Sequence, residues 1–288
     1  MASRNALVYA RFFAADARDK AKEEDVMEFQ QVLGIRRSIR YFEPDKPVEQ
    51  EKIQKILEAC RVASCAVNAH WLKAVVVKRA DISPEDLEKM KNPVQANVIA
   101  LAPVHIYLYG DPGVVNRYKG ARLKQLYDYG ALNPTHGWSH KFVDEIVYPQ
   151  ILKPLTEMPV YPVALAFDCG VSACQGLLMA FELGLGACLT AFVQEVVKKY
   201  TKAPDDWIPF YALNVGYPAE SREAGGQRPR PPFEEQYFLN HFGSPFPRDP
   251  KVVKELEESK LITTPARPDN GERRKEIRDL ARRLNLPM

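Results

Sequence analysis

The sequence is poor in cysteine and has no cysteine pair with the spacing of a metal site. Its 288 residues include five cysteines and no CxxC pair: Cys60, Cys65, Cys169, Cys174 and Cys188. An odd number of thiols without that spacing argues against a zinc site and against a disulfide framework. We therefore expect no metal ion, and we expect buried, reduced thiols in an intracellular protein.

Long apolar runs are missing as well. The run from Ala6 to Ala10 is interrupted by Arg11 before it reaches the length of a signal peptide. We find no stretch that approaches the ~18 apolar residues needed to cross a bilayer. These absences predict a cytoplasmic protein that does not enter a membrane.

An excess of charge of one sign is also absent. Lys and Arg number 40 against 37 Asp and Glu, so the formal net charge is only +3. The tail from Ser244 to Met288 carries 11 basic and 8 acidic side chains and so contains the whole surplus. So small a surplus does not indicate nucleic-acid binding. A binding module that uses this tail on nucleic acid or another protein is the alternative from a different functional class.

Proline, by contrast, is abundant. The chain has 23 prolines, and nine of them lie between Tyr200 and Pro250, which predicts a long extended segment there. The remaining composition, 46% hydrophobic and 27% charged, is that of a folded protein and excludes intrinsic disorder.

Apolar periodicity predicts a mixture of helices and strands. Between Val48 and Ala63, apolar residues recur at helical spacing and predict a helix that packs on the core. Runs of β-branched and aromatic residues predict strands over residues 74–77, 104–109 and 210–216. Because helices alternate with strands and no repeat is evident, the fold class is mixed α and β.

Three further segments have patterns of their own. Asp168 fits the N-cap of a helix that ends at Leu183 and is apolar on nearly every side, as a central or interface helix would be. Residues 110–162 carry many aromatics without a continuous core pattern and are expected to be helices and loops that lie over other elements. The basic residues from Arg273 to Arg283 fit a solvated amphipathic helix.

Two arginine clusters are the densest functional signal. Arg36, Arg37 and Arg40 flank Ser38 within five residues, and guanidinium groups with a nearby hydroxyl can surround a phosphate. Arg228 and Arg230 form the second cluster, embedded in prolines that would hold it extended. Each cluster alone is also compatible with an ordinary solvated surface patch.

Taken together, the motifs resemble the nitroreductase family over roughly residues 30–235. They occur in that family's order and spacing: Arg36-Arg37-Ser38-Ile39-Arg40-Tyr41-Phe42, Ala63-Ser64-Cys65-Ala66-Val67-Asn68, Gly184-Leu185-Gly186, Val215-Gly216-Tyr217-Pro218 and Arg228-Pro229-Arg230-Pro231. The resemblance implies an α+β fold with a central mixed β-sheet flanked by helices, in an intertwined homodimer with FMN at the interface. It divides the chain into a helical arm (1–30), an FMN-binding domain (31–235) with a lid-like insertion (110–162), and a partly helical C-terminal extension (236–288).

The resemblance also implies which residues hold FMN. Arg37 would contribute mainly through its backbone, and Asn68, with Cys65 and Ala66 beside it, would reach the flavin from the partner subunit. Residues 189–191 would meet the isoalloxazine edge, where a backbone amide would donate to flavin N5. The full implied set is Arg36, Arg37, Ser38, Arg40, Cys65, Ala66, Asn68, Gln95, Leu189, Thr190, Ala191, Arg228 and Arg230.

The implied reaction passes hydride from NADH or NADPH through flavin N5 to an electron-poor small molecule such as a nitroaromatic or quinone, in ping-pong fashion. No GxGxxG fingerprint is present, so the nicotinamide would bind only transiently. The chain departs from the family at Asn68-Ala69-His70-Trp71-Leu72, where the family usually has Asn-x-Gln-Pro-Trp. A specialised branch (reductive dehalogenation, dehydrogenation of a biosynthetic intermediate or flavin fragmentation) is therefore the alternative. His70 could donate a proton or only a structural hydrogen bond.

Overall fold

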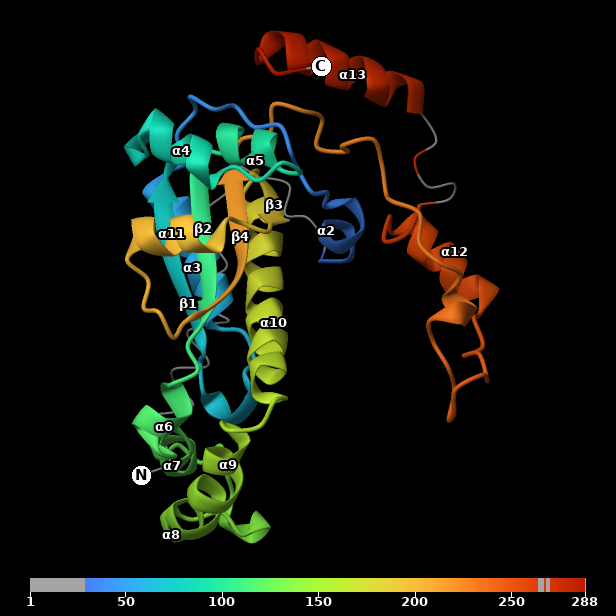
Figure 1. Cartoon of the computed structure of the whole chain (residues 1–288). Coiled ribbons are helices and arrows are strands. Elements are labelled where there is room, and N and C mark those ends of the chain that lie inside the picture. The colour runs from blue at the N-terminus through green and yellow to red at the C-terminus, as the bar shows by residue number, and fades with distance from the viewer. Residues whose placement is uncertain (1–28, 264–266, 268–269, 288) are drawn as a thin grey trace, which may run out of the picture.

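A four-stranded sheet with one long helix beside it forms the body of the protein (Figure 1). The computed structural model describes residues 29–263, 267 and 270–287, so nearly all of the arm expected over residues 1–30 lies outside the described part. The strands are β1 (Leu72–Lys78), β2 (Val104–Gly110), β3 (Gly186–Thr190) and β4 (Ile208–Gly216). Three of them confirm the strands expected from the sequence.

The sheet has the order β1-β2-β4-β3, and neighbouring strands are antiparallel. Within the described residues, parallel pairing is limited to an isolated bridge between Ser38 and Ala187. The α+β class is confirmed. The sheet was expected to contain both parallel and antiparallel pairs, and the one parallel contact among the described residues is that bridge. Ser38 thereby places the first arginine cluster along the outer edge of β3.

The two faces of the sheet are covered by different helices. Along β2 every residue is buried, and alternate side chains point to opposite faces. Ile106 and Leu108 pack in a cluster with α3 and α10, while Tyr107 and Tyr109 pack in a cluster that includes Val197 of α11. The covering helices are α3 (Gln50–Arg61), α4 (Pro84–Met90), α5 (Ala96–Leu101), α10 (Tyr161–Glu182) and α11 (Gln194–Thr201).

The long helix α10 corrects one expectation. It begins at Tyr161, with Pro162 in its first turn, so Asp168 lies inside the helix and is not its N-cap. The helix packs closely on α3, because a Cβ added to Gly176 would lie 2.4 Å from the Cys60 sulfur. By length and composition alone, α10 is long and apolar enough to cross a membrane. The expectation that no segment would reach that length and apolarity was therefore wrong for α10. The buried core helix of a soluble protein passes the same test, and α10 covers the sheet.

Residues 111–160 form a small helical cluster at one end of the body (Figure 1). The cluster has its own core, built with Trp71, whose indole N–H donates to the Tyr161 hydroxyl at 3.2 Å. Tyr161 in turn donates to the carbonyl of Pro112 at 2.8 Å. The segments are α6 (Val114–Tyr118), α7 (Ala121–Asp128), η3 (Pro134–His136), α8 (His140–Phe142), the π-helical η4 (Val143–Leu152) and α9 (Lys153–Leu155).

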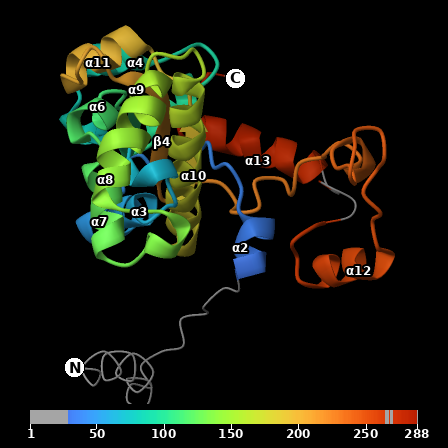
Figure 2. The same ribbon diagram turned by 90° about the horizontal axis from the view of Figure 1, so that it is seen from below.

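The C-terminal part leaves the body and returns to it. Figures 1 and 2 show the chain running past α2 (Phe29–Ile35) to α12 (Pro250–Glu258), which stands away from the sheet, and then back along α13 (Asn270–Arg283). Leu284 and Leu286, after α13, pack on Ile39 and Phe42 of the body. The remaining short segments are η1 (Ala66–Asn68), η2 (Arg79–Asp81) and η5 (Phe233–Glu235).

Candidate functional site

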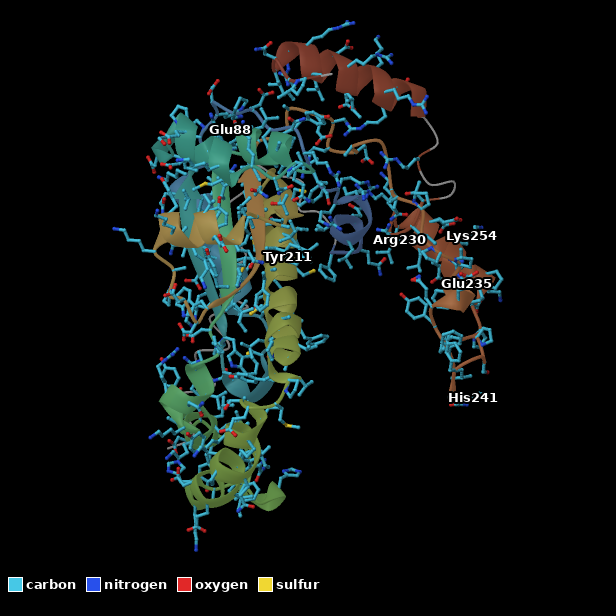
Figure 3. The ribbon with its side chains drawn as sticks, viewed as in Figure 1. Glu88, Tyr211, Arg230, Glu235, His241 and Lys254 are labelled. Carbon is cyan, nitrogen blue, oxygen red and sulfur yellow. The ribbon has the colours of Figure 1, made fainter. Side chains whose placement is uncertain are left out.

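The two arginine clusters meet in one cavity of about 300 Å³. The first cluster is positioned because Ile39 N–H donates to the Ala187 carbonyl of β3 at 3.1 Å. The second lies on the extended segment that follows β4, and Figure 3 places Arg230 between α2 and α12. The cavity is lined by Leu33, Arg36, Arg37, Ser38, Arg40, Tyr41, Ala224, Gly226, Gln227, Arg228, Arg230, Arg267, Arg273 and Ile277.

The charges in this cavity repel one another. The positive charge of Arg40 is the main cause that lowers the pKa of Arg228, and burial lowers the pKa values of Arg36 and Arg37. The Nε atom of Arg37 is buried without a hydrogen-bond partner among the described residues. A phosphate monoester, with close to two negative charges and several acceptor oxygens, would relieve the repulsion among these arginines. The donor set therefore fits a phosphate group.

Glu220, which the residue patterns did not indicate, binds the backbone of the first arginine cluster. Its side chain is fully buried, and Oε1 accepts from the backbone N–H of Tyr41 at 3.0 Å and from that of Arg40. This carboxylate fixes the backbone that carries the Arg40 guanidinium. An isolated glutamate gave no signal of this role, because its partners lie about 180 residues away in the chain.

Asn68 lies in a strained turn, away from the arginine cavity and next to the helical cluster of residues 111–160. Val67, Asn68 and His70 all have positive φ angles, of 48°, 52° and 52°, a region that non-glycine residues seldom occupy. The Asn68 Oδ1 atom lies 2.6 Å from the Nε2 atom of His70. Partial burial, followed by the charge of Arg122, lowers the pKa of His70, so the ring is neutral near neutral pH. Strain of this kind concentrates at functional sites.

Asp168 anchors the Asn68 turn from α10. Its Oδ2 atom accepts from the N–H of Ala66 at 2.8 Å and from the Cys65 thiol at 3.3 Å. The Cys65 sulfur accepts in turn from the N–H of His70 at 3.2 Å. Burial, assisted by the Asp168 charge, raises the pKa of Cys65, so the thiol stays protonated and acts as a hydrogen-bonding group in the turn.

Replacing Asp168 with alanine is expected to lower the free energy of unfolding by about 1–3 kcal/mol, because two donors in the turn lose their acceptor. Urea unfolding of the wild type and the variant measures the change. Asp144→Ala, which removes only an exposed ion pair with Lys124, is the control and should change stability by less than about 1 kcal/mol. Equal effects of the two substitutions would contradict the anchoring role.

The residues expected at the flavin edge lie in a third place. Thr190 is buried, and its Oγ1 accepts from the side chain of Asn214 at 2.8 Å, so its hydroxyl is occupied within the sheet. Asn92, another residue that the sequence analysis missed, donates to the Ala191 carbonyl at 3.0 Å and accepts from the N–H of Gln95 at 2.9 Å. Its Asn-Pro sequence was the available turn signal. The Oε1 atom of Gln95 is buried and has no partner among the described residues.

The Asn68 turn is flanked by two cavities, of about 540 and 510 Å³. The larger one is lined by Asn68 and His70 of the turn, and by Leu123, Leu126 and Trp138 of the helical cluster of residues 111–160. Arg122 fastens that segment to the turn through a hydrogen bond to the Ala69 carbonyl. Neither cavity shares a lining residue with the arginine cavity. A single chain thus places the two arginine clusters in one cavity and the Asn68 turn beside others.

The antiparallel sheet covered by a long apolar helix is an α+β fold, and it superposes on solved structures of the nitroreductase fold. The nitroreductase family model matches residues 34–217, which is more than half of the chain. The chain therefore belongs to the nitroreductase family. Arg228, Arg230 and the C-terminal helices lie beyond the matched residues.

Individual relatives agree with this assignment. The chain is 26% identical over 209 residues to a protein of Methanothermobacter thermautotrophicus described as a candidate NADH dehydrogenase/NAD(P)H nitroreductase, covering 70% of this chain and 82% of that protein. A nitroreductase-like protein of Streptococcus mutans superposes with a TM-score of 0.59 at 22% identity, covering 73% and 97% of the two chains. A candidate nitroreductase of Exiguobacterium sibiricum, solved in complex with FMN, gives 0.57 at 19% identity, covering 74% and 98%. About a quarter of this chain has no counterpart in these two structures.

Proposed function

We propose that this protein is an FMN-dependent oxidoreductase that uses NADH or NADPH to reduce an electron-poor small molecule such as a nitroaromatic or a quinone. The observation that carries the proposal is the convergence of both arginine clusters on one cavity within a nitroreductase-family chain. FMN, when bound, supplies the redox chemistry between the reductant and the acceptor. The protein's task is then to bind, orient and shield.

Each group of candidate residues has a proposed share in that task. Arg36, Ser38, Arg40, Arg228 and Arg230 bind the FMN phosphate, since the charge repulsion among the arginines favours an anion there. Gln95 and the backbone at Ala191, which Asn92 joins through hydrogen bonds, orient the ring system.

We also propose that Asn68 acts on the flavin held by a second copy of the chain. Its cavity is separate from the arginine cavity of its own chain. An exposed apolar stripe on α10, formed by Val163, Phe167 and Cys174, offers a surface for a homodimer contact. Exposed aromatics after η5, including Phe242 at 87% exposure, offer another. A sedimentation experiment that finds only monomer would contradict this arrangement.

The electron acceptor is expected to bind in the cavity between residues 111–160 and the Asn68 turn. Leu123, Leu126, Leu132 and Trp138 give this cavity a largely apolar wall, which suits a flat, poorly hydrated ring. We propose that the nicotinamide and the acceptor occupy it in turn, which gives ping-pong kinetics. The five free thiols support a reducing, cytoplasmic environment.

A specialised branch of the same fold is the second candidate. The observation that favours it is the altered turn, in which His70 bonds Asn68 and Trp71 is buried against Tyr161. One hydrogen-bonding position of the Asn68 amide, its Oδ1 atom, is thereby already used by His70 of the same chain. Substrate preference can therefore differ from that of family members with the usual Asn-x-Gln-Pro-Trp sequence.

The visible absorption spectrum of the purified protein, before and after addition of NADPH, tests the proposal. We expect a flavin spectrum that bleaches with NADPH and returns when a quinone or nitroaromatic is added. A protein that is colourless and does not take up FMN would overturn the proposed function. Bound flavin that NADPH and NADH fail to bleach would instead favour the specialised branch.

A further inference from the structure

The C-terminal helix α13 reaches the arginine cavity of its own chain. Arg273, in the first turns of α13, lines the cavity, and Arg267 lines it from the segment that precedes the helix. These residues lie beyond the part that matches the family model. The contribution of this extension follows from its contacts with the cavity.

Arg273 is largely withdrawn from solvent, whereas the amphipathic pattern predicted a solvated side chain. Only 9% of the side chain is exposed, and the guanidinium pairs with the buried Glu220 carboxylate and, at 2.7 Å, with Glu276. Its Nε atom has no partner among the described residues. The expectation for Arg273 was wrong because a buried acid from the loop after β4 meets this face of the helix. Hydrogen bonding to the two carboxylates raises the pKa of Arg273 although burial opposes it.

Glu220 connects α13 to the first arginine cluster. Its Oε2 atom accepts from Arg273, and its Oε1 atom accepts from the backbone N–H groups of Arg40 and Tyr41. One carboxylate thus joins the helix to the backbone that carries the Arg40 guanidinium. A change at Arg273 would leave a buried negative charge unpaired directly beneath the cavity.

A second set of contacts holds the extension to the other wall of the cavity. The Gln227 side chain donates to the Leu261 carbonyl at 2.9 Å and accepts from the N–H of Thr263 at 2.9 Å. Gly34 of α2 packs so closely on Lys260 that an added Cβ would lie 1.8 Å from its carbonyl oxygen. Hydrogen bonds therefore attach the extension to the cavity at two places, Glu220 and Gln227.

We propose that the C-terminal extension is part of the phosphate-binding site, with Arg273 as a positioning residue that acts through Glu220 on Arg40. The proposal rests on the proposed function, because it takes the phosphate of FMN as the ligand. Removing the Arg273 charge would displace the Arg40 backbone and leave the Glu220 charge to repel the phosphate. Both effects weaken phosphate binding and spare contacts to the flavin ring.

Flavin-fluorescence titration of the full-length protein with FMN and with riboflavin, which lacks the phosphate, tests this role. We expect Arg273→Gln to raise the FMN dissociation constant roughly ten- to a hundredfold, the loss of about one charge-assisted hydrogen bond, with riboflavin binding unchanged. The double variant Glu220→Gln/Arg273→Gln removes both charges and keeps an acceptor for the Arg40 N–H, so it should regain most of the FMN affinity. Arg274→Gln, an exposed neighbour on α13 outside the cavity, should bind both ligands as the wild type does.

Three outcomes would count against these conclusions in different ways. If Arg273→Gln binds FMN as tightly as the wild type, the proposed role of α13 is wrong. If Arg273→Gln and the double variant lose FMN and riboflavin equally, or fail to fold, α13 supports the fold and not the phosphate site. If the wild type itself binds no FMN, the proposed function fails and this inference fails with it.

Discussion

Replacing Arg228 with alanine is expected to raise the dissociation constant for FMN roughly ten- to a hundredfold and to leave riboflavin binding unchanged. The loss corresponds to one charge-assisted hydrogen bond to the phosphate, about 1.5–3 kcal/mol. Arg228 is a suitable target because its own side chain is exposed and the charge of Arg40 already lowers its pKa. Its removal therefore deletes a proposed phosphate contact without opening the core.

The stability of the apoprotein gives a second readout of the same change. Because Arg40 and Arg228 repel each other when no anion is present, the Arg228→Ala apoprotein should be at least as stable as the wild-type apoprotein. Addition of FMN should then raise its melting temperature by less than it raises that of the wild type. Arg248→Ala, also exposed on the proline-rich segment but located near the Phe233 ring, is the matched control. A loss of FMN affinity as large in Arg248→Ala would contradict the assigned site.

The second large effect concerns His105, at the centre of the sheet. This side chain is fully buried, and burial lowers its pKa from 6.5 to about 4. Its Nδ1 atom lies 2.7 Å from Oδ1 of Asn214, whose amide bonds Thr190 in the next strand. Because the unfolded chain binds a proton more readily than the folded one, stability is complete above pH 6.5 and is lost as the pH falls toward 4. The loss attributable to His105 at pH 4.5 is about 2–3 kcal/mol.

Urea unfolding at pH 7.5 and pH 4.5 measures this dependence. Carboxylates also titrate in this range, so the informative quantity is the difference between the wild type and His105→Gln. We expect the variant to lose about 2–3 kcal/mol less stability over this interval. His136→Gln, which changes an exposed histidine, should keep the wild-type dependence. Identical pH profiles for the wild type and His105→Gln would show that His105 is not responsible.

Residue patterns predicted those parts of the protein whose information is local. Runs of β-branched and aromatic residues predicted β1, β2 and β4 because such side chains pack well on a pleated surface. Helical spacing predicted α3, and the helix observed there spans Gln50–Arg61. The two arginine clusters stood out by their density, and it was the resemblance to the nitroreductase family that assigned them to a phosphate.

Features that depend on distant contacts were predicted less well. Asp168 resembled an N-cap because it precedes an apolar stretch, but the helix continues seven residues further back and Asp168 instead accepts from Ala66. Glu220 and Asn92 gave no functional signal because their partners are about 180 and 99 residues away. The amphipathic pattern placed Arg273 on the solvent face of a helix, but in the fold it pairs with the buried carboxylate of Glu220.

The sequence by itself determined the mixed α and β class, three of the strands and the two dense arginine clusters, because each of these depends on residues that are close together in the chain. Only the tertiary structure decided that residues 36–40 and 228–230 line one cavity, and that Asn68 lies in another. It also decided that Asp168 and Glu220 hold the segments that carry those residues. The physical reason is that a carboxylate at least partly withdrawn from water is stable only where the fold brings it donors, and these include backbone N–H groups more than 100 residues away in the chain.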